Sequence, residues 1–179
     1  MITLRGVFIY GLIILYSYAN AQDDSNSYSS DTTTINNYIK ESKKYIYADP
    51  DKTLLLADTI LDLSNKCNYR HGLFKAYNTK ACVYLNNFDL ELAFEYLNKA
   101  MPFATENDNP RNKAIILGNI GLLYRYQFNQ DSSTYYLQKV IDYTEKHEFH
   151  DLNSKALFDL STLYLQKNKY LETVELLFE

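Results

Sequence analysis

Glycine, proline and cysteine are scarce in this 179-residue chain, and tryptophan is absent. Five Gly and three Pro leave too few turn residues for an all-β sandwich, which turns about every 8–12 residues. Two Cys exclude a disulfide framework, and so little Gly and Pro excludes a collagen-like chain. Apolar residues make up 46%, with 18 Tyr, which is enough for a core. The composition therefore predicts a soluble, helix-rich protein.

The N-terminal segment carries one charged residue, Arg5, before the first acid at Asp23. A basic start, an apolar run over residues 7–18 and a small-residue end at Ala19-Asn20-Ala21 are the three parts of a secretory signal. We therefore expect a signal peptide at residues 1–21 and an exported, periplasmic or secreted chain. The alternative is an uncleaved membrane anchor, but the run has at most 16 residues and a spanning helix needs ~20.

The charge balance is mildly acidic once the signal is removed. Residues 22–179 keep 17 basic and 22 acidic residues, and the only arginines among them are Arg70, Arg111 and Arg125. Such a surface is poorly suited to tracking phosphates, so we expect no direct nucleic-acid ligand for this segment. No run within residues 22–179 is apolar for long enough to span a bilayer.

The remaining chain divides into a tether and a helical domain. Residues 22–34 are almost entirely polar and lack periodicity, which predicts a disordered tether. From Ile35 onward the apolar residues follow helical spacing, with helix starts such as Asp49-Pro50 and Asn109-Pro110, each an N-cap followed by proline. The expected helices span residues 35–48, 50–67, 71–86, 89–106, 110–127, 130–147, 151–167 and 169–179. They form four antiparallel pairs within residues 35–179: 35–67, 71–106, 110–147 and 151–179.

Three of these pairs match one another at a shift of 40 residues. Small residues on the two helices of a pair, 12 positions apart, let the backbones approach, and large residues nearby fill the adjoining grooves. Repeating this crossing buries a continuous core that one hairpin could not bury alone. The equivalent positions expected to pack the repeats are Tyr77, Leu117 and Leu157; Ala81, Gly121 and Ser161; Tyr84, Tyr124 and Tyr164; Ala93, Ser133 and Thr173; and Leu97, Leu137 and Leu177.

The unit from Lys75 to Ala100 resembles the tetratricopeptide repeat, with a small residue, Tyr three positions later, then Ala and Leu four apart. Its period of 40 residues exceeds the usual ~34, and the extra residues fall in loops and helix ends between pairs. The resemblance covers roughly residues 35–179. It implies an all-α fold, an α-α superhelix or solenoid of antiparallel helix pairs, and a non-catalytic scaffold that binds proteins or peptides.

In such repeats ligands lie on the concave face, lined by the first helix of each pair. There the resemblance places eight peptide-binding residues: Lys75, Asn78, Asn86, Arg125, Tyr126, Lys155, Phe158 and Gln166. They offer hydrogen-bond donors and stacking surface with little acid, which would suit an extended or helical peptide bearing carboxylates. The paired Lys, Asn and Arg set that tetratricopeptide clamps use for C-terminal carboxylates is missing, so that ligand is not predicted.

Long-period repeats behind a signal also resemble the sensor halves of some bacterial membrane-bound regulators. There the array precedes a membrane helix and a DNA-binding or kinase domain, which would make this chain the N-terminal sensor part. The last expected helix ends on apolar Leu176, Leu177 and Phe178, which indicates a truncated last pair or a homodimer through an open C-terminal end. A self-associating structural repeat and an envelope accessory protein of a carbohydrate-handling system remain alternatives.

Sequence motifs for catalysis are missing. The chain has no Gly-rich phosphate loop, H-E-x-x-H, C-x-x-C or G-x-S-x-G, so we predict no enzyme and no cofactor. Residues of the types that ligate metals cluster only between His147 and Asp151. The favoured interpretation of this cluster is a helix C-terminus followed by the N-cap of the next helix, so no metal is predicted. Cys67 and Cys82 could form a disulfide in an exported chain, but mismatched depths on their helices favour two buried thiols.

Overall fold

The computed structural model describes residues 31–104 and 109–166, and within them the fold is all-helical. A first helix at residues 31–45 is followed by α2 (Pro50–Lys66), α3 (Arg70–Asn86), α4 (Leu90–Ala100), the 3-10 turn η1 (Met101–Phe103), α5 (Pro110–Tyr126), α6 (Gln130–Lys146) and α7 (His150–Gln166). No strand occurs in these two ranges. The prediction of an all-α fold is confirmed.

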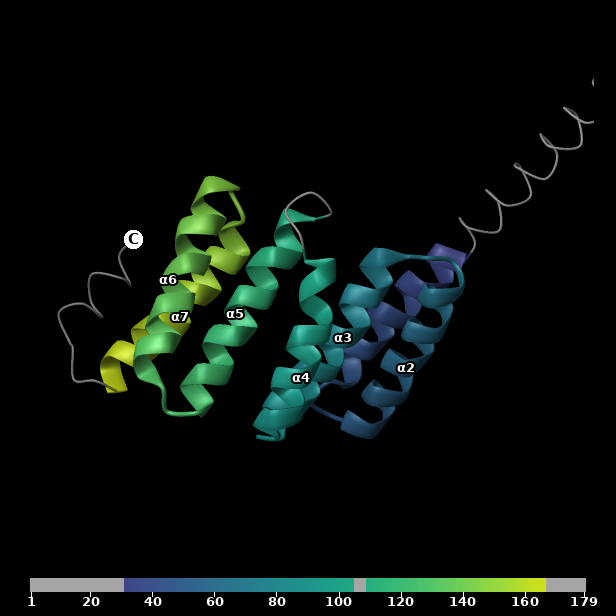
Figure 1. Cartoon of the computed structure of the whole chain (residues 1–179), viewed down its shortest axis with the longest axis horizontal. Coiled ribbons are helices and arrows are strands. Elements are labelled where there is room, and N and C mark those ends of the chain that lie inside the picture. The colour runs from purple at the N-terminus through teal and green to yellow at the C-terminus, as the bar shows by residue number, and fades with distance from the viewer. Residues whose placement is uncertain (1–30, 105–108, 167–179) are drawn as a thin grey trace, which may run out of the picture.

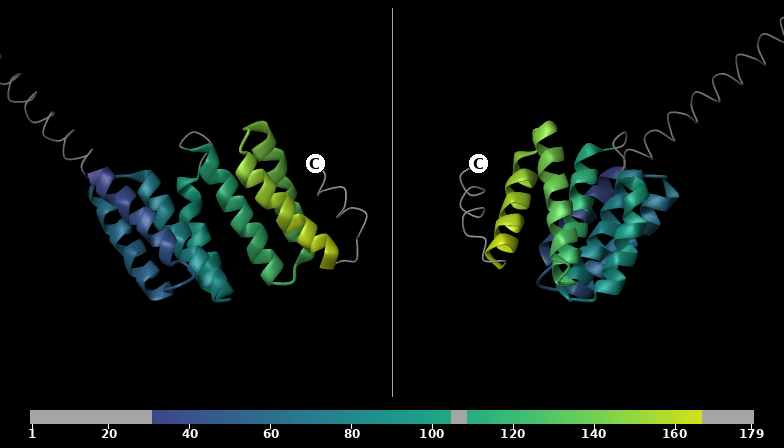
Figure 2. Two further views of the ribbon diagram at one scale, coloured as in Figure 1. Left: turned by 180° about the vertical axis from the view of Figure 1, so that it is seen from behind. Right: turned by 60° about the vertical axis from the view of Figure 1, so that its left-hand side comes forward.

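The helices pack against one another in sequence order, as antiparallel neighbours in one row from the purple to the yellow end of Figure 1. The two turned views of Figure 2 show the same order. The core is divided along this row into three clusters, which include Ile35 at the N-terminal end, Phe74 in the middle and Leu160 at the C-terminal end. Each hairpin thus buries its apolar face mainly against its neighbours, which is how a solenoid is stabilised.

Most helix starts follow capping signals in the sequence. The side chains of Asp49, Asp89, Asn109 and Asn129 each accept a hydrogen bond from a backbone N–H in the first turn of the helix that follows, at 3.0 to 3.3 Å. These bonds satisfy donors that have no partner inside the helix. The four caps therefore fix where α2, α4, α5 and α6 begin.

Four of the connections are three-residue turns of one type. Their middle residues are Asn68, Phe88, Phe128 and Glu148, each in the left-handed region with φ between 52° and 59°. In each turn the next residue donates its N–H to the carbonyl five positions earlier, at 2.8 or 2.9 Å. This is the Schellman ending of a helix, which usually has glycine at the left-handed position. Here none of the four positions is glycine.

Two helix bounds differ from the sequence prediction by about a turn or more, and the other described bounds differ by at most three residues. The first helix already includes residues 31–34, assigned to the tether, because Ile35 and Ile39 anchor one face and the polar residues extend it by an exposed turn. The α-helix expected to reach residue 106 ends at Ala100, because Pro102 has no N–H to donate and its ring would clash with a preceding carbonyl. The expected signal, the rest of the tether and the helix at 169–179 lie outside the described residues.

A buried lysine in α3 depends on an acid in α2. Lys80 is 8% exposed, and its Nζ lies 2.5 Å from Oδ1 of Asp58. Burial works to lower the pKa of Lys80, but the hydrogen bond and the charge of Asp58 outweigh burial and raise it. We expect Asp58→Asn to lower the free energy of unfolding by about 1 kcal/mol, since a buried charge would lose its counter-charge.

The matched control for that change is Asp62→Asn in the same helix. Asp62 pairs with Lys66 across one exposed turn, and such pairs contribute only a few tenths of a kcal/mol. Urea unfolding of both variants should therefore show a clearly larger loss for Asp58→Asn. Equal losses would mean that the Lys80 pair contributes no more than a surface ion pair.

Candidate functional site

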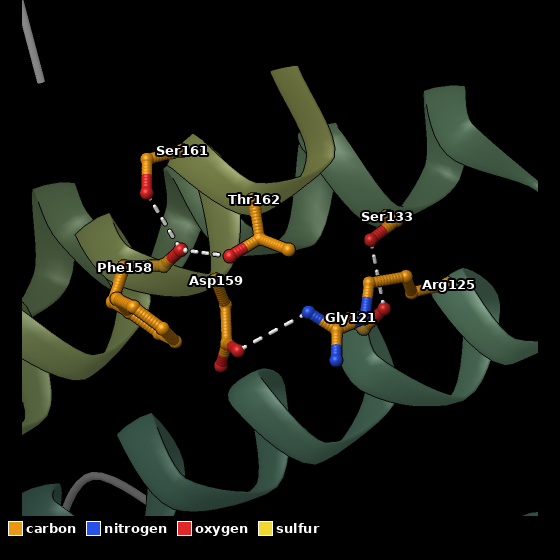
Figure 3. A network of polar contacts seen from close by, with 7 residues as sticks. All are labelled: Gly121, Arg125, Ser133, Phe158, Asp159, Ser161 and Thr162. Atoms are coloured by element: carbon orange, nitrogen blue, oxygen red, sulfur yellow. Dashed lines mark hydrogen bonds and ion pairs between the residues drawn. The ribbon is translucent and has the colours of Figure 1, made fainter. Parts of the chain in front are cut away.

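The first helices of successive hairpins contact one another directly and form one surface. Asn119 of α5 donates from Nδ2 to Oδ1 of Asn78 in α3, at 2.8 Å. Arg125 of α5 donates from Nη1 to Oδ1 of Asp159 in α7, at 3.3 Å (Figure 3). Arg111 also pairs with Asp151, at the other end of the same two helices. We call the solvent-facing surface of helix 31–45, α3, α5 and α7 the first-helix face.

The expected packing positions occupy the hairpin interiors beneath this face. Those that are buried are Ala81, Ala93, Leu97, Gly121, Ser133, Leu137 and Ser161, and those that are half-buried are Tyr77, Tyr84, Leu117, Tyr124, Leu157 and Tyr164. Ser133 Oγ donates to the carbonyl of Gly121 at 2.9 Å, which joins two small residues 12 positions apart (Figure 3). Thr173 and Leu177 lie outside the described residues.

Two pairs of stacked tyrosines lie beside these crossings. The rings of Tyr84 and Tyr96 have centroids 5.4 Å apart, and those of Tyr124 and Tyr136 are 5.5 Å apart. In both pairs the partner comes 12 residues later, on the second helix of the hairpin. The sequence prediction missed Tyr96 and Tyr136, although they too are related by the 40-residue shift.

The N-terminal end of α3 presents a half-buried cation on the first-helix face. Lys75 forms no ion pair or hydrogen bond with any residue that the structure describes, and its Nζ lies 5.2 Å from the ring of Phe74. Burial, together with the charges of Lys43 and Arg111 on the neighbouring helices, lowers the pKa of Lys75 to about 8. Burial and the charges of Lys75 and Lys43 also lower the pKa of His71. This basic end therefore combines several positive groups without a local acid at Lys75.

The middle of the face is neutral and hydrogen-bonded. Asn119 Nδ2 lies 3.6 Å from Sγ of Cys82, and Asn78 Nδ2 lies 3.8 Å from the same sulfur. Burial raises the pKa of the Cys82 thiol, although Lys155 and the Asn119 hydrogen bond oppose it. Cys82 and Cys67 are both free thiols in this structure.

The C-terminal end of the face carries an ion pair between α5 and α7. Burial raises the pKa of Asp159, against the opposing effects of Arg125 and Lys155. Arg125 is therefore committed to a neighbouring acid, whereas Lys155 is exposed and lies within no ion pair among the described residues. Phe158 is 66% exposed, and its carbonyl accepts from the hydroxyls of Ser161 and Thr162 (Figure 3).

A groove of about 470 Å³ opens where α5 and α7 end. It brings together three of the eight predicted residues, Arg125, Tyr126 and Gln166, whereas Lys75 lies at the opposite end of α3. Asn86 lies two positions before Phe88 but does not line the groove. It is half-buried, and its Nδ2 has no hydrogen-bond partner among the described residues. The lining is completed by Thr162 and by three side chains that the sequence prediction missed: Phe88, Phe128 and Gln130. The sequence signal for Phe88 and Phe128 is that a Phe recurs in equivalent turns, 40 residues apart.

The histidine-rich turn between α6 and α7 has packing and linking roles. The ring of His147 lies 4.4 Å from that of Tyr143 and 5.7 Å from that of Phe149, and Asp151 pairs with Arg111. In the described ranges, no three His, Cys, Asp or Glu side chains gather as a cation site.

Comparison with known proteins does not assign a family. A scan against protein-family models found none that matches, and a search of curated proteins also found no match. None of the helices at residues 31–104 and 109–166 has both the length and the apolarity to cross a membrane. The class that the structure defines is an all-helical row of antiparallel hairpins with a continuous face across its first helices.

Proposed function

We propose that this chain is a tetratricopeptide-like, non-catalytic scaffold whose first-helix face binds a polypeptide segment bearing carboxylates. The observation that carries the proposal is Lys75, a half-buried ammonium without an ion pair among the described residues. A buried charge is costly unless it is paired, so a ligand carboxylate beside Lys75 would stabilise both groups. Lys43 raises the positive potential at the same place, and Arg111, although paired with Asp151, adds to it.

The extent of the face supports a polypeptide ligand over a small molecule. It crosses four helices, so a ligand that contacts all of them must be extended. Extended faces of helical repeats are suited to bind peptides. The thiol of Cys82 supports the non-catalytic part of the proposal, because its raised pKa disfavours the nucleophilic thiolate.

The wider role that we propose is that of an exported sensor segment in a membrane-bound signalling or transcription-regulating protein. It rests on the signal-like residues 1–21 and on the long repeat period. The reading frame that follows the codon of Glu179 provides the test. A membrane helix and a regulatory domain there would support the sensor role, and a stop codon at that point would contradict it.

The binding proposal predicts acidic ligands and a dependence on two lysines. A displayed library of random peptides selected on the purified chain should yield sequences enriched in Asp and Glu. Their affinity should fall with salt, and it should fall about tenfold or more in the double variant Lys75→Gln, Lys155→Gln, because two uncommitted cations are lost. Arg125 is left intact, since its removal would leave Asp159 without its counter-charge.

The matched control is Lys99→Gln on α4, whose Nζ pairs with Glu95 at 2.5 Å in the second helix of a hairpin. This variant should bind the selected peptides as the wild type does. Fluorescence anisotropy measures the affinities, and circular dichroism should show the same helicity in all three proteins. Peptides without acidic enrichment, or equal affinity in the double variant, would contradict the proposal.

A further inference from the structure

Two phenylalanines hold backbone conformations that do not suit them. Phe88 has φ 59° and Phe128 has φ 58°, and both are the middle residues of their turns. The left-handed region costs a bulky residue roughly 1 kcal/mol or more, whereas glycine and asparagine tolerate it. The same turn between α2 and α3 uses Asn68 at φ 52°. An asparagine would therefore serve the fold at least as well at both positions.

The two rings also gain little from burial. Phe88 is 68% exposed and Phe128 is 90% exposed. A side chain that strains the backbone and remains in water contributes little to stability, so its role is to be sought in recognition. Backbone strain of this kind at a solvent-facing aromatic is typical of a binding position.

Both rings line the groove at the ends of α5 and α7. The ring of Phe88 packs at 4.9 Å from that of Tyr126, with the planes 51° apart, and Phe128 borders the same space. The apolar lining of the groove consists of these three rings. The polar lining comprises Arg125, Gln130, Thr162 and Gln166, whose side chains all carry hydrogen-bond donors.

The groove has almost no net charge to offer a ligand. Arg125 is its one charged lining residue, and the carboxylate of Asp159 lies 3.3 Å away. Charge complementarity thus favours an uncharged ligand that presents apolar surface to the rings and carbonyl groups to the amides of Gln130 and Gln166. This differs from the basic end of the same face, which suits carboxylates.

We propose that this aromatic groove binds a proline-rich segment in the polyproline II conformation. The proposal rests on the function proposed above, since it takes the first-helix face as a peptide-binding surface and names a ligand class for one end of it. Polyproline II has no internal hydrogen bonds, so its carbonyls can accept bonds from the side-chain amides of Gln130 and Gln166. Its pyrrolidine rings pack on aromatic side chains, and the segment loses little entropy because it is already extended.

The repeat spacing also fits such a ligand. Every third residue of polyproline II lies on the same side, about 9 Å further on. Phe88 and Phe128 occupy the same position in adjacent hairpins, whose first helices pack directly through Asn78 and Asn119. Because both phenylalanines line one groove, two prolines three residues apart on the same side of the segment would each face one of them.

The test uses the full chain and a fluorescein-labelled peptide of Pro-Gln-Gln repeats. We expect it to bind more tightly than a counterpart with each proline replaced by alanine, with little dependence on salt. The double variant Phe88→Asn, Phe128→Asn should lose tenfold or more of this affinity without a fall in melting temperature. Phe94→Asn, which removes an exposed ring on α4, outside both the first-helix face and the groove lining, is the control and should bind as the wild type does.

The acidic library peptides provide the second arm of the experiment. Their binding should be unchanged in the double phenylalanine variant, because it depends on Lys75 and Lys155, neither of which lines the groove. Equal affinity for the proline and alanine peptides would overturn the groove proposal, while retained acidic-peptide binding would leave the proposed function standing. A lower melting temperature in the double variant would also overturn the groove proposal, because it would show that the two rings stabilise the fold by packing. Phe-dependent binding of a malto-oligosaccharide, with no binding of the proline peptide, would also overturn it.

Discussion

Replacing Gly121 by leucine is expected to unfold the hairpins on both sides of it together. A Cβ at this position would lie 3.3 Å from Leu137, which is 1% exposed, and 3.4 Å from Cβ of Tyr136. The rest of a leucine side chain would have to push α6 away from α5 and break the bond from Ser133 to the Gly121 carbonyl. Overpacking of this kind should lower the free energy of unfolding by about 3 kcal/mol.

The loss should spread beyond α5 and α6 because the core is shared between neighbours. The middle core cluster joins α3, α4 and α5, so separating α5 from α6 also exposes residues that support α4. Circular dichroism should show a lower melting temperature, and hydrogen exchange should show faster exchange in α4 as well as in α6. Faster exchange confined to α6 would contradict the nearest-neighbour coupling.

A glycine one turn earlier supplies the control. A Cβ on Gly118 would meet only a methyl group of Val140, at 3.9 Å, which is an ordinary contact. Gly118→Ala should therefore stabilise the protein by roughly 0.5–1 kcal/mol through helix propensity. Gly121→Ala should gain less or lose stability, because Leu137 must move. Equal gains from both alanines would contradict the close approach at Gly121.

The helices were predictable because their determinants are local. Caps such as Asp49 and Asn129 and the apolar period identify the starts and the buried sides without knowledge of the tertiary structure. Pro102 is also a local signal, but the apolar residues continue past it, which favours a longer helix than the structure has. The turns were harder to predict, since a Schellman ending is inferred from glycine, and Phe88 and Phe128 stand where glycine is expected.

The binding side chains were only partly predictable. Lys75, Arg125 and Lys155 look alike in the sequence, as basic residues on first helices. Their availability depends on tertiary partners: Asp159 engages Arg125, whereas Lys75 has two neighbouring cations and no acid at ion-pair distance among the described residues. Whether a basic residue is paired therefore depends on how helices distant in sequence are placed, as for Arg125 and Asp159, which are 34 residues apart. Helical spacing alone does not determine this placement.

Removing the charge of Lys75 is expected to stabilise the fold. In the folded chain burial and the charges of Lys43 and Arg111 lower the pKa of Lys75 to about 8, from an ordinary value of 10.5. At pH 7 the folded state must therefore hold an unfavourable charge, which corresponds to on the order of 2–3 kcal/mol. Lys75→Met keeps a flexible side chain of similar length, so it should raise the free energy of unfolding by about that amount.

The gain should disappear as the pH rises, and the sign follows from proton binding. Between pH 8 and 10.5 the unfolded wild type binds more protons at residue 75 than the folded wild type, so the stability of the wild type rises with pH. The advantage of Lys75→Met is therefore complete at pH 7 and fades as the pH rises through 8. His71 also faces Lys75, and its lowered pKa keeps it neutral over this range. Urea unfolding at pH values from 7 upward measures the difference in free energy of unfolding between Lys75→Met and the wild type. Lys99→Met removes an exposed lysine and is the control, for which we expect little change in the free energy of unfolding at any of these pH values.

The same substitution should weaken binding of the selected acidic peptides, because it removes the cation proposed to meet their carboxylates. A residue that lowers stability and yet is needed for a ligand is typical of a binding site, where function limits how far the fold can be optimised. A gain in stability that does not decline with pH would contradict the lowered pKa of Lys75. A gain at pH 7 with unchanged peptide affinity would show that Lys75 is a destabilising lysine but not the anchor for the ligand.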